Sequence, residues 1–107
     1  MATFNDVFGS EEFEEDVLCF RNELTSLEGC PENVPGNFNC SNNLLKNLKG
    51  GPRIVKGDYN CNLNKLIQLE GAAEIVEGDF SCFSNEIESL IGLPKKIHCG
   101  VNVAKNK

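Results

Sequence analysis

The chain has 107 residues, of which 40% are hydrophobic and none is tryptophan, and its formal net charge is −6. This length allows one domain, and the hydrophobic fraction excludes a disordered chain. No apolar run approaches the roughly 18 residues that a membrane-spanning helix requires. The acidic balance lacks the concentrated basic face of a nucleic-acid-binding protein, so we expect neither a membrane nor a nucleic acid as direct partner.

Residues 1–16 are predicted to form an acidic N-terminal cap. The first ten residues have neither the basic start nor the apolar stretch of a signal peptide, so we expect a cytoplasmic protein. Ser10 is a suitable N-cap for a short helix over residues 11–16, whose first turn is acidic. Four apolar side chains of this segment are expected to cover the domain that follows: Phe4, Val7, Phe8 and Phe13.

From residue 17 onward the sequence repeats every 21 residues, without insertions. The units are residues 17–37, 38–58, 59–79, 80–100 and a truncated unit, 101–107. The clearest columns are cysteine (Cys19, Cys40, Cys61, Cys82), asparagine (Asn22, Asn43, Asn64, Asn85), leucine (Leu27, Leu48, Leu69, Leu90) and aromatic (Phe38, Tyr59, Phe80). A period of this kind predicts a solenoid, in which each unit stacks on its neighbours.

Each unit is predicted to begin with a short strand, at residues 17–19, 38–40, 59–61, 80–82 and 101–103. The aromatic and the cysteine stand two residues apart, so both point into the interior, and the leucine columns turn inward after them. The strands stack in parallel and in register. The rest of each unit is too short and too rich in glycine for a helix, so we expect irregular turns or extended pieces on the convex side.

The unit reads aromatic-x-Cys-x-x-Asn-x-Leu-x-x-Leu-x-Gly-x-Pro, as in residues 38–52. Over about residues 17–106 this pattern resembles the leucine-rich repeat, most specifically in its asparagine and leucine columns. It departs from that family where an aromatic and a cysteine replace two aliphatic residues. The 21-residue length is similar to short bacterial and phage members. The resemblance implies a concave five-stranded face and an asparagine ladder, whose amides satisfy backbone groups at the strand ends.

The sequence offers no catalytic, metal or cofactor site. Four stacked cysteines would extend over roughly 14 Å, which is too far for one zinc ion to join them. We therefore interpret them as small buried hydrophobic residues. Disulfides between adjacent repeats are the alternative, which a cytoplasmic location disfavours. His98 and Cys99 are strand neighbours that point to opposite faces, and no P-loop or nucleophile elbow is present. We expect a protein without enzymatic activity and without cofactors.

The candidate binding residues point outward from the strands. Most outward positions are small and polar, whereas Phe20, Leu63 and Phe83 are apolar, and an exposed apolar side chain in such surroundings is informative. Leu63 and Phe83 are expected to form one patch with an acidic border at Asp58 and Asp79. The full set of expected partner-binding residues is Leu63, Phe83, Asp58, Asp79, Asn60, Asn62 and Phe20.

Three functions are compatible with this pattern. The first is a protein–protein interaction module, such as a phage-encoded inhibitor or adaptor that binds a host protein in the host cytoplasm. Its partner would offer a hydrophobic anchor and basic side chains. The second is an acidic mimic of nucleic acid that blocks a DNA- or RNA-binding enzyme. The third is a structural component that assembles with itself. At the C-terminal edge, either a second copy, giving a homo-oligomer, or the partner is expected to cover the last repeat.

Overall fold

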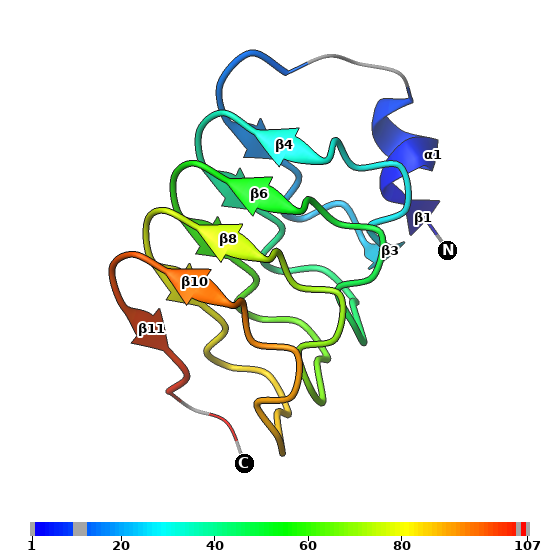
Figure 1. Ribbon diagram of the computed structural model, residues 1–107. Coiled ribbons are helices and arrows are strands. Elements are labelled where there is room, and N and C mark those ends of the chain that lie inside the picture. Colours follow the sequence, from blue (N-terminus) through cyan, green and yellow to red (C-terminus); the bar gives the residue numbers. More distant parts are fainter. Residues whose placement is uncertain (1, 10–12, 105, 107) are drawn as a thin grey trace.

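The structure, a computed structural model, describes residues 2–9, 13–104 and 106. It is a mainly-β solenoid of about five turns, as Figure 1 shows. We number the turns as coil 1 (residues 17–37), coil 2 (38–58), coil 3 (59–79), coil 4 (80–100) and the partial coil 5 (from residue 101). Each coil contributes one strand to each of two parallel sheets, except that coil 5 reaches only the first.

The first sheet confirms the predicted strands and their register. Each strand is two residues long and pairs in parallel with the residues 21 positions away, as Phe38 pairs with Tyr59. Its five strands are β2 (Val17–Leu18), β5 (Phe38–Asn39), β7 (Tyr59–Asn60), β9 (Phe80–Ser81) and β11 (Val101–Asn102).

A second parallel sheet lies on the return side of the coils, where we expected irregular turns or extended pieces. The structure forms the extended pieces and joins them into four strands: β4 (Asn33–Val34), β6 (Ile54–Val55), β8 (Ile75–Val76) and β10 (Lys96–Ile97). Their inward residues Val34, Val55 and Val76 are fully buried. β-Branched pairs such as Ile54–Val55 favour extended backbone, and the 21-residue period places them in register.

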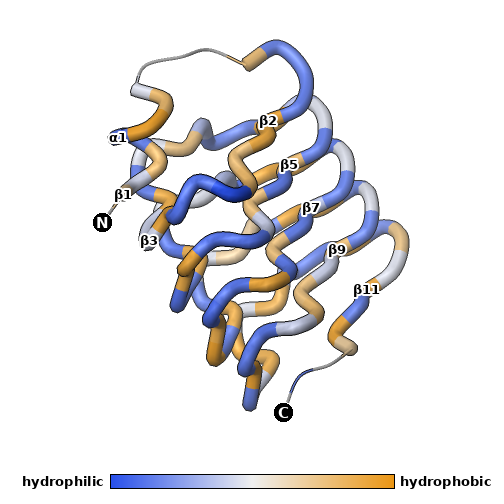
Figure 2. The backbone as a smooth tube through the Cα atoms, turned by 180° about the vertical axis from the view of Figure 1, so that it is seen from behind, coloured by the Kyte–Doolittle hydropathy of each residue, from blue (hydrophilic) through white to orange (hydrophobic). Residues whose placement is uncertain are grey.

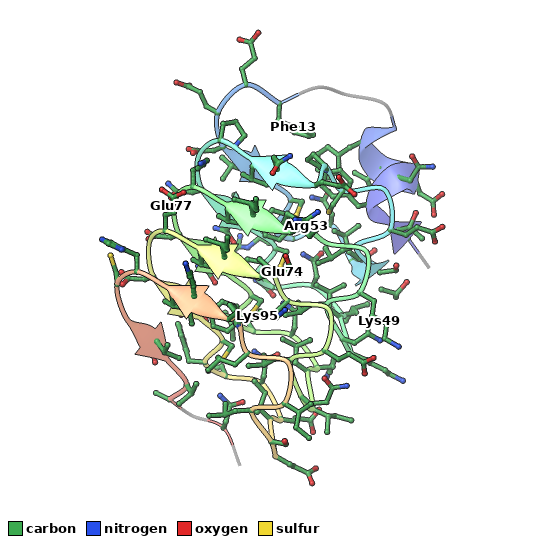
Figure 3. All side chains as sticks on the ribbon, in the orientation of Figure 1. Phe13, Lys49, Arg53, Glu74, Glu77 and Lys95 are labelled. Atoms are coloured by element: carbon green, nitrogen blue, oxygen red, sulfur yellow. The ribbon has the colours of Figure 1, made fainter. Side chains whose placement is uncertain are left out.

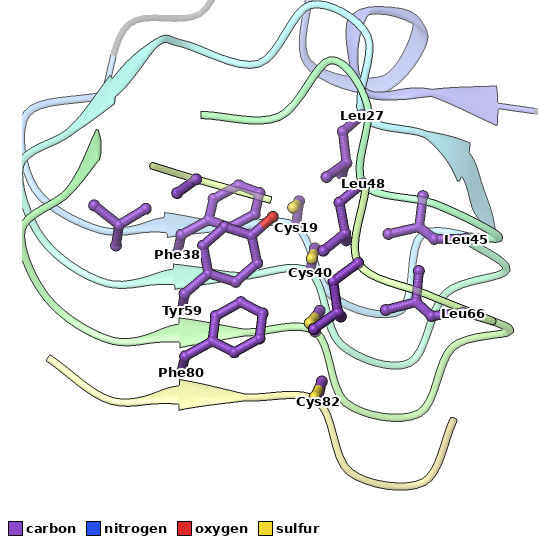
Figure 4. Close-up of a cluster of buried hydrophobic side chains, with 14 of the residues drawn as sticks. Cys19, Leu27, Phe38, Cys40, Leu45, Leu48, Tyr59, Leu66, Phe80 and Cys82 are labelled. Carbon is purple, nitrogen blue, oxygen red and sulfur yellow. The ribbon is translucent and has the colours of Figure 1, made fainter. Parts of the chain in front are cut away.

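The core between the two sheets consists of the predicted columns (Figure 4). The rings of Phe38, Tyr59 and Phe80 form a column with centroids 5.0 and 5.2 Å apart and ring planes tilted by 58° and 44°, next to the column of buried cysteines. The leucine column is buried at Leu27, Leu48 and Leu69, but Leu90 is 50% exposed. Leu90 is not covered as its counterparts are, because no full coil lies over it in the part of the chain that the structure describes.

The N-terminal cap differs from the prediction in its helix. The helix is α1 (Phe4–Phe8), preceded by β1 (Ala2–Thr3), which pairs with β3 (Leu24–Ser26). The Thr3 hydroxyl accepts the Asp6 N–H, and the Asp6 carboxylate accepts the Thr3 N–H, both at 3.0 Å, which is a capping box. Residues 13–16 are not helical. Residues 10–12, including the proposed N-cap Ser10, lie outside the described residues.

Three of the four predicted cap side chains do cover coil 1. Phe4 is buried, and its ring lies 4.6 Å from that of Phe8 and 5.9 Å from that of Phe13. Val7 is exposed, so its inclusion was wrong: it lies on the outer side of the short helix. In the described part of the chain, no helix reaches the length and hydrophobicity that crossing a membrane requires.

Candidate protein-binding face

An asparagine ladder shapes the loop that follows each strand of the first sheet. The Asn43 amide donates to the carbonyls of Cys19 and Cys40, both at 3.0 Å, and its oxygen accepts the N–H groups of Asn22 and Leu24, both at 2.9 Å. Asn85 repeats this pattern two coils further on. The buried backbone groups at the strand ends are thus satisfied from within, and the loop geometry is the same in each coil.

The ladder leaves the residue before each asparagine with a left-handed backbone. The φ angles of Arg21, Asn42, Leu63 and Ser84 lie between 55° and 57°. Asparagine tolerates this region because its short polar side chain can bond locally, whereas leucine pays a steric cost of about 1–2 kcal/mol. Leu63 is therefore held in a strained conformation, with its side chain 49% exposed.

Leu63 and Phe83 lie together on adjacent coils. The Leu63 N–H donates to the Phe83 carbonyl at 3.1 Å, so their backbones are direct neighbours. The Phe83 side chain is only half-buried. Two accessible apolar residues are therefore neighbours along the backbone at the end of the sheet where β7 and β9 enter the asparagine loops.

A second apolar group lies on coil 1 of the same face. Phe20 is 42% exposed, so α1 and the cap do not cover it. Leu18, two residues earlier and on the same side of the strand, is 51% exposed. Leu18 is one of the outward positions that the repeat predicts, although it is not among the predicted binding residues; its spacing of two from Phe20 was the available signal. Figure 2 shows apolar residues running without a break through β2, whereas the later strands alternate.

Asp58 and Asp79 belong to a second ladder, which the sequence analysis interpreted only as an acidic border. Asp58 Oδ1 accepts the Asp79 N–H, and Asp79 Oδ1 accepts the Gly100 N–H, both at 2.8 Å. Asp16 and Asn37 form the preceding rungs. Both Asp58 and Asp79 remain exposed, so they support the backbone and carry charge at the border of the face.

The same ladder explains one glycine column. A Cβ added at Gly57 would lie 2.2 Å from Asn37 Oδ1, and one at Gly78 would lie 2.3 Å from Asp58 Oδ1. No side chain fits beside the rung. The recurring Gly-Asn or Gly-Asp pair before β5, β7 and β9 was the sequence signal for this ladder.

The two predicted asparagines of coil 3 differ in their availability. Asn60 is half-buried, and its oxygen accepts the Asn62 N–H at 3.0 Å. Asn62 is buried, and its oxygen accepts the Ser81 hydroxyl at 2.7 Å and the Phe83 N–H at 2.8 Å. Asn62 thus joins coils 3 and 4 and positions Phe83, while little of its side chain is accessible to a partner.

We define the binding face by Leu18, Phe20, Asp58, Asn60, Leu63, Asp79 and Phe83. It is an ordered sheet surface with exposed leucine and phenylalanine side chains, small polar residues between them and carboxylates along one border. Such a surface can bind an apolar anchor flanked by basic groups.

The cysteines add no reactive group to this face. Burial raises the pKa of the Cys19 thiol to about 12 and that of Cys82 to about 11, so both are protonated at neutral pH. All six cysteines are free thiols. Within the described residues, no three histidine, cysteine or carboxylate side chains are grouped so that they could hold a metal ion.

Comparisons with protein-family models, with curated proteins and with solved structures found no match for the chain. The fold alone defines the class of protein, which is a mainly-β solenoid with a 21-residue coil and two parallel sheets.

Proposed function

We propose that the chain is a non-enzymatic protein-binding module of leucine-rich-repeat type that contacts its partner through the binding face. More specifically, the chain would be a phage-encoded inhibitor or adaptor of a host protein. The partner would carry a hydrophobic anchor that fits between Leu63 and Phe83, with lysine or arginine opposite Asp58 and Asp79.

The observation that carries this proposal is the leucine at position 63. At this place in the coil the fold favours asparagine, which coil 2 has at Asn42. A leucine there is strained and half exposed, so it stabilises neither the backbone nor the core. Its presence is explained if the side chain becomes buried in a complex, where burying a leucine contributes about 1.5–3 kcal/mol.

The test is a pull-down from bacterial lysate with three proteins: wild type, Leu63→Asn and Ile67→Asn. Ile67 is the matched control, because its side chain is 50% exposed, nearly the same fraction as the 49% of Leu63. Ile67 differs in lying in the loop beyond the sheet. We expect one host protein to be captured by wild type and by Ile67→Asn, and lost with Leu63→Asn. Equal capture by all three proteins, or by none, would contradict the proposal.

Ionic strength distinguishes protein binding through the binding face from mimicry of a nucleic acid. A contact centred on Leu63 and Phe83 should persist in 1 M salt, where the Debye length falls to about 3 Å and exposed charges are screened. Binding that disappears under these conditions would favour the acidic mimic instead.

A further inference from the structure

The outer surface of the second sheet lies on the side of the solenoid opposite the binding face, because the core separates the two sheets (Figure 1 and Figure 2). Its inward residues Val55 and Val76 are fully buried, so the residues next to them in the strands point outward. At the centre these are Ile54 and Ile75, which pair in register and are half-buried. We call this surface the rear face, and it is formed by residues 32–35, 53–56, 74–77 and 95–98.

Charged side chains flank the two isoleucines on both sides. Arg53 Nε lies 3.3 Å from Glu74 Oε2, and Lys56 Nζ lies 3.1 Å from Glu77 Oε2. The four side chains are 46–63% exposed, so each charge can still meet a second partner. The centre of the rear face is therefore apolar, with a basic border in coil 2 and an acidic border in coil 3.

The alternation of charge continues into the outer coils. Glu32, Arg53, Glu74 and Lys95 occupy one column of the repeat, and Figure 3 shows the last three one below the other. Lys95 Nζ lies 4.0 Å from Glu74 Oε1. A rotation by 180° that exchanges coil 2 with coil 3 also exchanges coil 1 with coil 4, so it places every charge of this column opposite its counter-charge. The rear face is thus complementary to itself, which is the property that a two-fold symmetric dimer requires.

We propose that the rear face binds a second copy of this chain, with the two solenoid axes antiparallel and the strands of the two sheets aligned. Ile54 of each copy lies against the partner's Ile75. Arg53 lies opposite the partner's Glu74, and Lys56 lies opposite the partner's Glu77. Two sheets packed face to face keep their strands aligned within about 30°, which this arrangement satisfies. An apolar centre with a charged rim is the usual composition of an interface.

The charges and the isoleucines together select this arrangement. A two-fold axis along the solenoid would set each coil on itself and would bring Arg53 to the partner's Lys56. An axis between coils 3 and 4 would place Lys96 on the partner's Ile75, and an axis between coils 1 and 2 would place Asn33 on the partner's Ile54. The axis between coils 2 and 3 joins apolar to apolar and acid to base.

The dimer would carry two binding faces on its two outer sides, because each binding face lies on the far side of the core from the rear face. A partner with two copies of its own anchor would then be held at both ends, and the second contact would form as an intramolecular step. This inference goes beyond the proposed function, since a binding face can act without the dimer.

Sedimentation velocity of the full chain measures the dimer directly. A rear face of four short strands is small for a protein interface, so we expect a weak dimer that forms between roughly 10 μM and 1 mM. Arg53→Glu should weaken it by about tenfold or more, because symmetry places the repulsion in two contacts at once. The control Lys65→Glu, an exposed lysine outside the rear face, should leave the dimer unchanged.

Mixing two variants separates the interface from any effect on folding. Arg53→Glu and Glu74→Arg should each stay monomeric alone, whereas their equimolar mixture should dimerise, because opposite charges meet again between the two chains. Mixing cannot restore the ion pair within either chain, so recovery assigns these residues to the interface. Leu63→Asn should leave the dimer intact, which keeps this test independent of the proposed function.

Three results would overturn the inference. The first is a wild-type chain that remains monomeric up to about 1 mM. The second is a dimer that Arg53→Glu leaves intact, because another surface would then form it. The third is a mixture of the two variants that does not associate.

Discussion

The asparagine ladder predicts a specific loss of stability when one inner rung is removed. Asn64 donates to the carbonyls of Cys40, Cys61 and Asn62 at 3.0–3.2 Å, and its oxygen accepts the Leu45 N–H at 3.0 Å. In Asn64→Ala these four hydrogen bonds disappear together. The consequence for each backbone group depends on its other partners.

The three carbonyls keep one donor each after the substitution. The Cys40 carbonyl retains the Asn43 amide, the Cys61 carbonyl retains the Asn85 amide, and the Asn62 carbonyl retains the Asn42 N–H. For the Leu45 N–H, the Asn64 oxygen is the acceptor that the structure shows. An orphaned buried N–H costs about 1–3 kcal/mol, and the weakened carbonyls add to this, so we expect a loss of about 2–3 kcal/mol.

The assay is urea unfolding followed by circular dichroism. With a slope of about 1–3 kcal/mol per molar urea for a domain of this size, the midpoint should fall by roughly 0.7–3 M. Asn22→Ala is the matched control from the first rung, where the amide makes one hydrogen bond, to the Phe20 carbonyl at 3.0 Å. An Asn64→Ala midpoint no lower than that of Asn22→Ala would refute the reasoning.

Four further predictions follow from single positions. The Tyr59 hydroxyl is buried without a hydrogen-bond partner among the described residues, so Tyr59→Phe should raise the free energy of unfolding by about 1 kcal/mol in urea melts. Leu63→Asn should also stabilise, by about 1 kcal/mol, because asparagine tolerates a φ of 57°. Gly71→Ala should destabilise by more than about 1 kcal/mol, since φ is +94° and the new Cβ would lie 2.3 Å from the Lys49 nitrogen. Burial raises the pKa of Cys19 to about 12 and that of Cys82 to about 11 from an ordinary 9.0. The contribution of these protonated thiols to the free energy of unfolding is therefore fully present below about pH 9 and is lost as the pH rises toward 11–12. The urea midpoint should consequently be lower at pH 10 than at pH 8.

Each of these predictions has an outcome that contradicts it. A less stable Tyr59→Phe would mean that the hydroxyl has a partner, and a less stable Leu63→Asn would mean that the leucine packs within the fold. Gly9→Ala is the control for Gly71→Ala, because φ is +60° at Gly9 but nothing lies within 4 Å of the added Cβ. Equal midpoints at pH 8 and pH 10 would show that the thiols do not contribute.

The repeat made the solenoid predictable, because the aromatic, cysteine and asparagine columns each have one physical role. The helix of the cap was predicted at residues 11–16 but lies at Phe4–Phe8, and the residues explain this difference. Residues 11–16 have only Phe13 as an apolar side chain, so a helix there would have no face to bury. Phe4 and Phe8 stand four residues apart on one face of α1, and Thr3 and Asp6 cap it.

The binding face was predictable in its composition but not in its hydrogen bonds. An outward aspartate before a strand can be a ligand for a basic partner or a rung of a ladder, and the sequence pattern of Asp58 is the same in both cases. Only the 2.8 Å distance to the next backbone N–H shows that it is a rung. The buried state of Asn62 likewise depends on Ser81 and Phe83 in the next coil, which no pattern within one unit contains.

Charges alternate between successive coils in one column of the repeat: Glu32, Arg53, Glu74 and Lys95. These alternating charges solve a problem that the repeat itself creates. Because the apolar columns are the same in every unit, a chain that skipped one coil would still bury its aromatic, cysteine and leucine side chains. Such a slip would place Arg53 against Lys95 and Glu28 against Glu70, whereas the correct stacking pairs Arg53 with Glu74. Each exposed ion pair stabilises the fold by only about 0–1 kcal/mol, but the slipped register replaces several attractions by repulsions at once. The charges therefore contribute to the choice of register more than to stability.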